Sequence, residues 1–102
     1  MKIIDKALLS LFGLGVWCAY CGKRAPGLDP HHLWAKGLGA GSRLDISINL
    51  IGLDRRCHTL VHAGKIKKAA LLAIVAKREG TTPEAITDEI NRLLRLPKGA
   101  TP

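Results

Sequence analysis

Apolar residues near the start of the chain recur at the spacing of one helical face. Intervals of three and four residues are typical of an amphipathic helix. Gly13 and Gly15 follow directly and mark its end. We therefore predict a helix over residues 2–12. Its apolar face consists of Ile3, Ile4, Ala7, Leu8, Leu11 and Phe12.

Two short stretches in the middle of the chain have the pattern of strands. Residues 28–34 contain the sequence DPHHLW, and residues 46–53 (ISINLIGL) alternate between apolar and polar positions over their first half. Residues 35–43 (AKGLGAGSR) contain three glycines and are expected to form a loop. This region therefore predicts two short strands on either side of a glycine-rich loop.

The rest of the chain has helical patterning. A helix is expected to open at Cys57 and to break at Gly64, and residues 65–79 resume with strong helix formers that Gly80 ends. Thr81 and Glu84 have capping-box spacing for a last helix, which Pro97 stops. Its apolar face is expected to pack into the core or to form a dimer interface. That face consists of Ile86, Ile90, Leu93 and Leu94.

Length and composition indicate one small folded domain over residues 1–102. Hydrophobic residues make up 47% of the 102 positions but aromatic residues only 4%, so aliphatic side chains must fill a modest core. A core of this size often needs a metal or a partner subunit. Sixteen Lys and Arg against eight Asp and Glu give a net charge of +8. This excess favours a polyanionic partner, and general solubility is the alternative.

The chain has no run that approaches the roughly 20 apolar residues of a membrane span. Its first 15 residues are interrupted by Asp5 and Lys6 and are not followed by a small-residue cleavage site. We therefore expect a cytoplasmic protein without a membrane partner.

Three cysteines suit metal binding better than a disulfide framework. Cys18 and Cys21 form a C-x-x-C knuckle, and Asp54 and Cys57 repeat the same offset after the second predicted strand. Two such knuckles can close a tetrahedral zinc site. His58 and His62 are competing candidates for the fourth ligand, and free buried cysteines are the alternative to a metal site.

The four histidines form two tight pairs. His58 and His62 lie four residues apart and can hold one ion from the same helical face. His31 and His32 are adjacent on a predicted strand, where neighbouring side chains point to opposite faces. These two are therefore expected to serve different roles.

In this order and spacing, the segments CAYC, DPHHLWAKG and INLIGLDRRCHTLVH resemble the HNH endonucleases, the ββα-metal nucleases. The resemblance covers residues 18–62 and leaves the helical flanks, 2–12 and 65–96, outside it. It implies a small α+β fold in which the two predicted strands form a two-stranded antiparallel hairpin. This hairpin, a helix and zinc knuckles form the ββα-metal unit, with helices on its flanks. At Asp54 the chain departs from zinc-containing members, which usually carry cysteine there.

The resemblance also implies roles for the site residues. His32 is the general base, and Asn49 either ligates the ion or braces the loop that orients the base. His58 is the last histidine of the pattern, and with His31 and His62 it binds one divalent catalytic ion (Mg, Mn, Ni or Zn). The two knuckles hold a separate structural Zn, with Cys18, Cys21, Asp54 and Cys57 as its ligands.

The implied activity is hydrolysis of DNA, most simply double-stranded, with weak sequence specificity and a possible homodimer. The cations nearest the site are expected to hold the phosphate backbone. They are Lys36, Arg43, Arg55 and Arg56. A zinc-ribbon nucleic-acid-binding module without catalysis, or a ribonuclease with the same site, are the alternatives.

Overall fold

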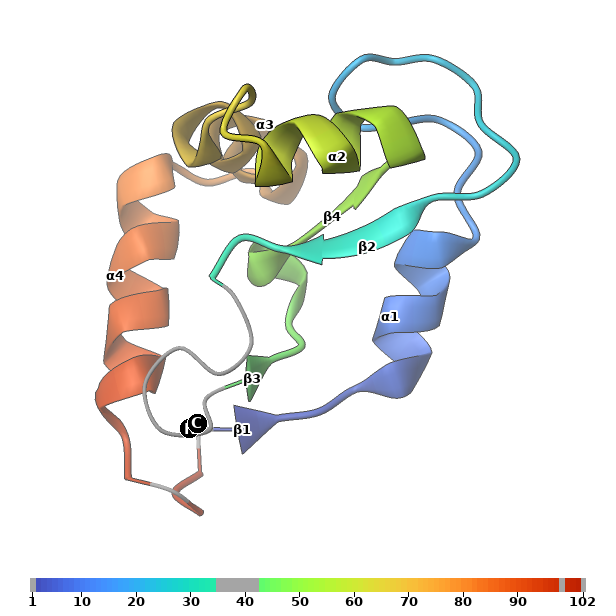
Figure 1. Ribbon diagram of the computed structural model, residues 1–102. Coiled ribbons are helices and arrows are strands. Elements are labelled where there is room, and N and C mark those ends of the chain that lie inside the picture. Colours follow the sequence, from blue (N-terminus) through green and yellow to red (C-terminus); the bar gives the residue numbers. More distant parts are fainter. Residues whose placement is uncertain (1, 35–42, 98, 102) are drawn as a thin grey trace.

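The structure is a computed structural model in which residues 2–34, 43–97 and 99–101 are described. Four helices surround two pairs of short strands (Figure 1). In chain order the elements are β1 (Lys2–Ile3), α1 (Lys6–Gly13), β2 (Asp29–His32), β3 (Arg43–Leu44), the 3-10 helix η1 (Ser47–Asn49), β4 (Leu50–Leu53), α2 (Arg55–His62), α3 (Lys68–Glu79) and α4 (Pro83–Arg95).

The predicted antiparallel pair is confirmed and lies at the centre of the molecule. It joins β2 to β4, with His31 opposite Ile51 and His32 opposite Leu50. In Figure 1, helix α2 crosses above this pair, and α1 packs against the pair from below at the right. The pair therefore carries the two adjacent histidines directly beneath the helix that carries the other two.

The N-terminal helix starts later than predicted. Residues Lys2–Ile3 form β1, which pairs in parallel with Arg43–Leu44 of β3, and the helix begins only at Lys6. Asp5 stops the helix from extending further back, because its side chain accepts a hydrogen bond from the Leu8 amide at 2.9 Å and so acts as the N-cap. The parallel β1–β3 pair was not expected from the sequence.

The second predicted strand is also shorter than its pattern suggested. Residues Ser47–Asn49 turn as η1, closed by a hydrogen bond from the Asn49 amide to the Ile46 carbonyl at 3.0 Å, and only Leu50–Leu53 form β4. All four residues of β4 are buried. Arg43 lies in β3 instead of the predicted loop, and residues 35–42 lie outside the described part of the chain.

The three helices of the second half differ from their predicted bounds at their first residues. Helix α2 opens at Arg55, two residues before Cys57, because Asp54 caps it. Helix α3 begins at Lys68 instead of residue 65. Gly80 ends it in the left-handed conformation (φ 68°), as expected of a C-terminal glycine.

The cap of α4 is Thr82, not Thr81: its hydroxyl accepts from the Ala85 amide at 3.1 Å. Pro83 then occupies the first helical position, where its missing amide hydrogen leaves no hydrogen bond unmade. The apolar face of α4 packs into the core, where Ile86, Ile90 and Leu93 are buried. Of the two roles considered for this face, core packing is therefore the one observed.

In the part of the chain that the structure describes, none of the helices combines the length and the apolarity that a bilayer span requires.

Candidate metal centres

A tight turn builds the first knuckle. The Cys18 amide donates to the Lys23 carbonyl at 3.0 Å, and the Gly22 amide returns to the Cys18 carbonyl at 2.9 Å. Gly22 has a φ of +72°, a conformation that side chains disfavour. The Ala19 amide then donates to the Gly52 carbonyl at 3.0 Å, which fastens the turn to β4. This contact brings Cys18 and Cys21 to the start of α2.

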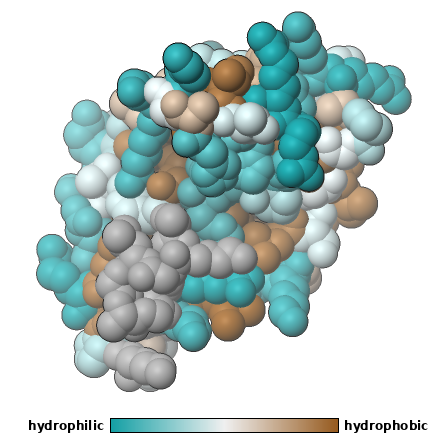
Figure 2. Space-filling view, viewed as in Figure 1, coloured by the Kyte–Doolittle hydropathy of each residue, from teal (hydrophilic) through white to brown (hydrophobic). Residues whose placement is uncertain are grey.

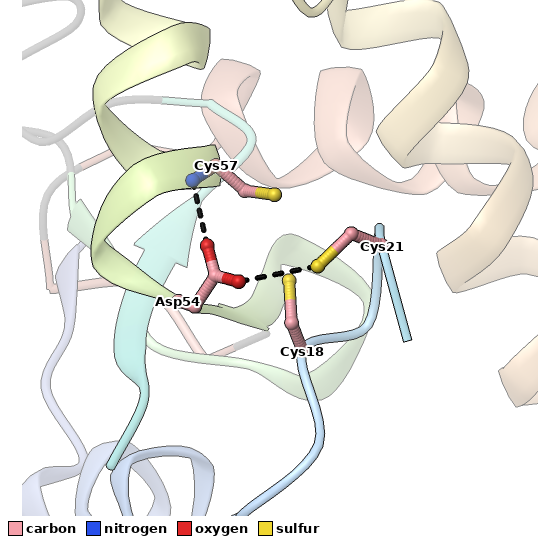
Figure 3. Close-up of side chains that lie close together, drawn as sticks. All are labelled: Cys18, Cys21, Asp54 and Cys57. Carbon is pink, nitrogen blue, oxygen red and sulfur yellow. Dashed lines mark hydrogen bonds between the residues drawn. The ribbon is translucent and has the colours of Figure 1, made fainter. Parts of the chain in front are cut away.

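Four side chains from the two knuckles converge there, as Figure 3 shows. We call Cys18, Cys21, Asp54 and Cys57 the cysteine cluster; their ligand atoms all lie within 4.8 Å of one another. The ligand atoms of a tetrahedral zinc site with bonds of about 2.1–2.3 Å lie about 3.4–3.8 Å apart. A small contraction would bring the cluster to that spacing.

Asp54 serves two partners at once. One carboxylate oxygen accepts from the Cys57 amide at 2.7 Å and caps α2, and the other accepts from the Cys21 thiol at 3.1 Å. The Cys57 amide and the Cys21 thiol hold the pKa of Asp54 below its usual range. The carboxylate is therefore charged and already aimed at the cysteines.

The pKa values of two thiols in the cysteine cluster, Cys18 and Cys57, are shifted in opposite directions. Burial raises the pKa of Cys18, but the backbone amides of Cys21, Asp54 and Tyr20 outweigh it and lower the pKa below that of a free thiol. Burial and the nearby Asp54 carboxylate raise the pKa of Cys57. Several negative ligands in one buried place repel each other unless a cation joins them. The cluster is consistent with structural zinc on this chemistry.

The histidines of β2 and α2 form a second group of possible metal ligands. His31 of β2 and His58 and His62 of α2, here the histidine cluster, offer nitrogens that all lie within 4.8 Å of one another. The Nε2 atoms of His58 and His62 are 3.1 Å apart, and the His31 ring lies 5.2 Å and 5.7 Å from theirs, centroid to centroid. The predicted three-histidine grouping is a possible second metal site. His58 and His62 belong here and not to the cysteine cluster.

A carboxylate that the sequence reading left without a role orients this group. Asp29 accepts from Nδ1 of His58 at 3.0 Å and lies 3.4 Å from Nε of Arg55. Because Nδ1 is occupied, His58 presents Nε2 to His62. A carboxylate behind a ligating histidine is a recurrent feature of metal sites, where it fixes the tautomer and raises the basicity of the ligand.

His31 is held neutral. Burial, and then the neighbouring His58, His62 and His32, lower its pKa to about 4. Its lone pair is therefore free at neutral pH, as a metal ligand requires.

His32 points away from the histidine cluster to a different partner. Its Nε2 lies 2.8 Å from a carboxylate oxygen of Asp45, whose side chain is completely buried. Arg43 approaches the other oxygen of the same carboxylate at 3.0 Å. The two adjacent histidines thus have separate surroundings, as strand alternation predicted.

Asn49 is buried and hydrogen-bonded to backbone groups on both sides of residues 35–42. Its Oδ1 accepts from the Trp34 amide at 2.7 Å, and its Nδ2 donates to the carbonyls of Leu44 at 2.9 Å and Trp34 at 3.2 Å. This is the geometry of a brace.

The predicted phosphate-binding cations have different positions. Arg55 has an 84% exposed side chain beside Asp29, and Arg56 is exposed on the same turn. Arg43 is engaged with Asp45, and Lys36 lies outside the described residues. Contact of these cations with nucleic acid stays a prediction.

A cavity of about 380 Å³ adjoins the histidine cluster, and His31, His32, His62, Lys67 and Lys68 are among its lining residues. Figure 2 shows hydrophilic side chains over most of the upper part of the molecule in this view, where α2 and α3 lie in Figure 1. A cavity with two lysines in its lining, Lys67 and Lys68, therefore lies next to the imidazoles.

Asp29 and Asp45 are the site residues that sequence reasoning missed. Asp29 opens the DPHH segment, so its nearness to the histidines was visible, but its partner on α2 is 29 positions away. Asp45 follows β3 directly, and only its contact with His32 of β2 reveals that this carboxylate is buried beside a histidine. Asp29 could have been found from its position two residues before the histidine pair. The sequence held no comparable signal for Asp45.

Comparison with models of protein families, with curated proteins and with solved structures found no match and assigns the chain to no family.

Proposed function

We propose that the protein is a metal-dependent endonuclease of the HNH type that hydrolyses phosphodiester bonds of double-stranded DNA. The observation that carries this proposal is the division of labour on β2. His31 joins two other imidazoles in a group suited to one ion, and the adjacent His32 lies outside that group with a partner of its own. A site built only to hold metal has no use for the second imidazole.

The histidine cluster suits a divalent ion because its three imidazole nitrogens converge from a strand and a helix. Such an ion neutralises charge on the phosphate and stabilises the leaving oxygen. Three protein ligands leave positions open, which is typical of catalytic sites. Mg, Mn, Ni and Zn are the candidates, and imidazole favours the last three.

The remaining chemistry belongs to side chains of the chain. His32 takes a proton from a water molecule, and the resulting hydroxide attacks phosphorus. The phosphorus–oxygen bond opposite then breaks, and the leaving oxygen acquires a proton from solvent. Histidine suits the first step because imidazole accepts protons near neutral pH. Arg55 and Arg56 hold flanking phosphates, and the adjoining cavity admits the scissile group.

Asn49 assists by bracing the chain. Its side chain is hydrogen-bonded to Trp34, two residues after His32, and to Leu44, the residue before Asp45. It therefore ties together the two chain segments that carry His32 and Asp45. This arrangement supports the brace role and gives no support to direct ligation. The basic net charge of +8 supports a nucleic-acid substrate in general.

Plasmid nicking by metal-free protein, after addition of Mg, Mn, Ni or Zn singly, tests the proposal. We expect cleavage with at least one ion, and at least about a hundredfold slower cleavage by His32→Ala, the lower range for loss of a general base. Nicking of wild type that His32→Ala leaves unchanged would contradict the assigned base.

His62→Ala is the matched control, because it removes an imidazole from the ion instead of from the proton transfer. Its cleavage should recover partly at higher Mn or Ni concentration, and that of His32→Ala should not. A parallel assay on single- and double-stranded RNA separates the ribonuclease alternative. Tight binding without cleavage of either nucleic acid would indicate the non-catalytic module.

A further inference from the structure

We infer that Asp45 is a positioning residue for the proposed reaction: it fixes the His32 ring so that Nε2 carries the hydrogen and Nδ1 is the atom that accepts the proton from water. This inference rests on the proposed function for its catalytic part. Its structural part, the tautomer of His32, stands on the geometry around Asp45 alone.

The Asp45 carboxylate is fully enclosed and fully used. Its side chain is 0% exposed, and one oxygen accepts from Nε2 of His32 at 2.8 Å. The Arg43 guanidinium contacts both oxygens, with Nε at 3.1 Å and 3.2 Å. The Asp5 amide donates to the second oxygen at 2.9 Å. A buried acid with this many donors is held in one orientation.

These donors also keep the acid ionised. Burial alone would raise the pKa of Asp45, but the hydrogen bonds from Arg43, His32 and the Asp5 amide outweigh it and lower the pKa to about 2. An ionised carboxylate can only accept hydrogen bonds. The ring nitrogen that faces it must therefore carry a hydrogen, which leaves the lone pair of a neutral His32 on Nδ1.

The same contacts explain why the chain has its extra strand pair. Arg43 lies in β3 and Asp5 lies two residues after β1, so the parallel β1–β3 pair places two of the three partners of Asp45. A further bond from the Asp45 amide to the Ile3 carbonyl at 2.8 Å joins the carboxylate's own backbone to β1. The N-terminal segment, outside the residues that resemble the HNH motif, thereby sets the orientation of the proposed base.

The His32 side chain keeps a small opening on the other side. It is 8% exposed and contributes to the lining of the cavity that adjoins the histidine cluster. Asp45 therefore holds the ring from the protein side, and the substrate would approach from the cavity.

The tautomer can be measured without any activity. Nitrogen-15 NMR of the histidine rings, in zinc-loaded wild type at neutral pH, should show His32 protonated at Nε2 with an unprotonated Nδ1. In Asp45→Asn the preference should weaken, since the amide that replaces the carboxylate can donate as well as accept. Asp88→Asn, an exposed site on α4, is the matched control and should leave the His32 signals unchanged. A wild-type ring protonated at Nδ1 alone would overturn the inference even if no variant folds.

Kinetics test the catalytic part. Asp45→Asn should lower kcat by about ten- to a hundredfold, up to the whole contribution of a base, with KM for DNA and affinity for the catalytic ion unchanged. In a His32→Ala background the same change should have no further effect, since Asp45 acts only through that ring. An equal loss in both backgrounds would overturn the positioning role. Wild type that cleaves with no metal would overturn the proposed function and the catalytic part together, and the NMR result would still decide the tautomer.

Discussion

The cysteine cluster and the histidine cluster both take residues from the short helix α2, but they differ in how far they are closed to solvent. The cysteine cluster has four ligands, two of them from buried cysteines that are 2% exposed, and it joins two knuckles. The histidine cluster has three, its His62 is exposed, and a cavity lies beside it. Closed four-ligand sites are typical of structural zinc, and sites with an open position are typical of catalysis. The difference teaches that one helix can anchor with its first turn and expose chemistry with its later turns.

The two clusters also use carboxylates differently. Asp54 belongs to the ligand set itself and caps α2, whereas Asp29 stands behind His58 and orients it. We expect that a thiolate can take the place of Asp54, whereas replacement of Asp29 removes the hydrogen bond that orients the His58 ring. Variants at these positions should therefore separate the two regions.

The largest expected effect is on the cysteine cluster. Cys18→Ser should lose the zinc and unfold the protein at or near room temperature, because the free energy of metal binding is part of the free energy of folding. His62→Ala, the control on the same helix, should keep one zinc per chain and melt within a few degrees of wild type. Metal analysis and thermal melts give both values. Zinc loss in His62→Ala would mean that this histidine completes the cysteine cluster, and the comparison would fail.

The second prediction uses acid on protein loaded with one zinc per chain. His31 has a pKa of about 4 in the folded state, below the ordinary histidine value of about 6.5. Between these values the unfolded chain binds a proton that the folded chain does not, so the free energy of unfolding should fall as the pH drops from 6.5 to 4. His31→Gln should show a shallower fall in the same range. Identical pH profiles by denaturant melts would contradict a buried neutral His31.

A smaller effect is expected at Asp29, the carboxylate that orients His58 in the histidine cluster. Asp29→Asn should weaken the ion of the histidine cluster by about ten- to a hundredfold, the usual range for a carboxylate that orients a ligating histidine. The zinc of the cysteine cluster should be retained in full. Calorimetric titration of Mn or Ni into the variant measures the first, and metal analysis the second. Equal weakening of both sites would show that Asp29 acts on the fold as a whole.

The smallest effect should come from Asp54→Cys. A thiolate should retain or raise the affinity for zinc, but the cap on the Cys57 amide is lost, at about 1 kcal/mol. We therefore expect tighter zinc binding with little net change in the melting temperature of the loaded protein. Asp54→Ala, which loses ligand and cap together, is the control. A fall in zinc affinity in Asp54→Cys would show that the carboxylate is the preferred ligand in this cluster.

Local pattern was enough for much of the fold. The C-x-x-C knuckle, the i, i+4 histidines and the glycine that ends α3 each depend on neighbours in sequence, and all have the predicted arrangement. Strands β2 and β4 also lie within the two stretches that the local pattern predicted as strands, and their antiparallel pairing is the one that the family resemblance implied.

Long-range pairing could not be read in the same way. Lys2 and Ile3 continue the helical pattern of the residues after them, yet they pair with Arg43 and Leu44. Competition between a local helix and a distant strand depends on packing, which periodicity does not encode. For the same reason Asp45 had no signal in the sequence, and its contact with His32 became visible only in three dimensions.

The position of the cysteine cluster at the first turn of α2 bears on how the protein matures. An isolated helix of eight residues is too short to persist in water. The alignment of His58 with His62 therefore depends on the anchor that Asp54 and Cys57 make with the first knuckle. If the protein is the nuclease that we propose, a newly synthesised chain should be unable to cleave nucleic acid until it acquires zinc. The supply of zinc would then set the moment at which its activity begins.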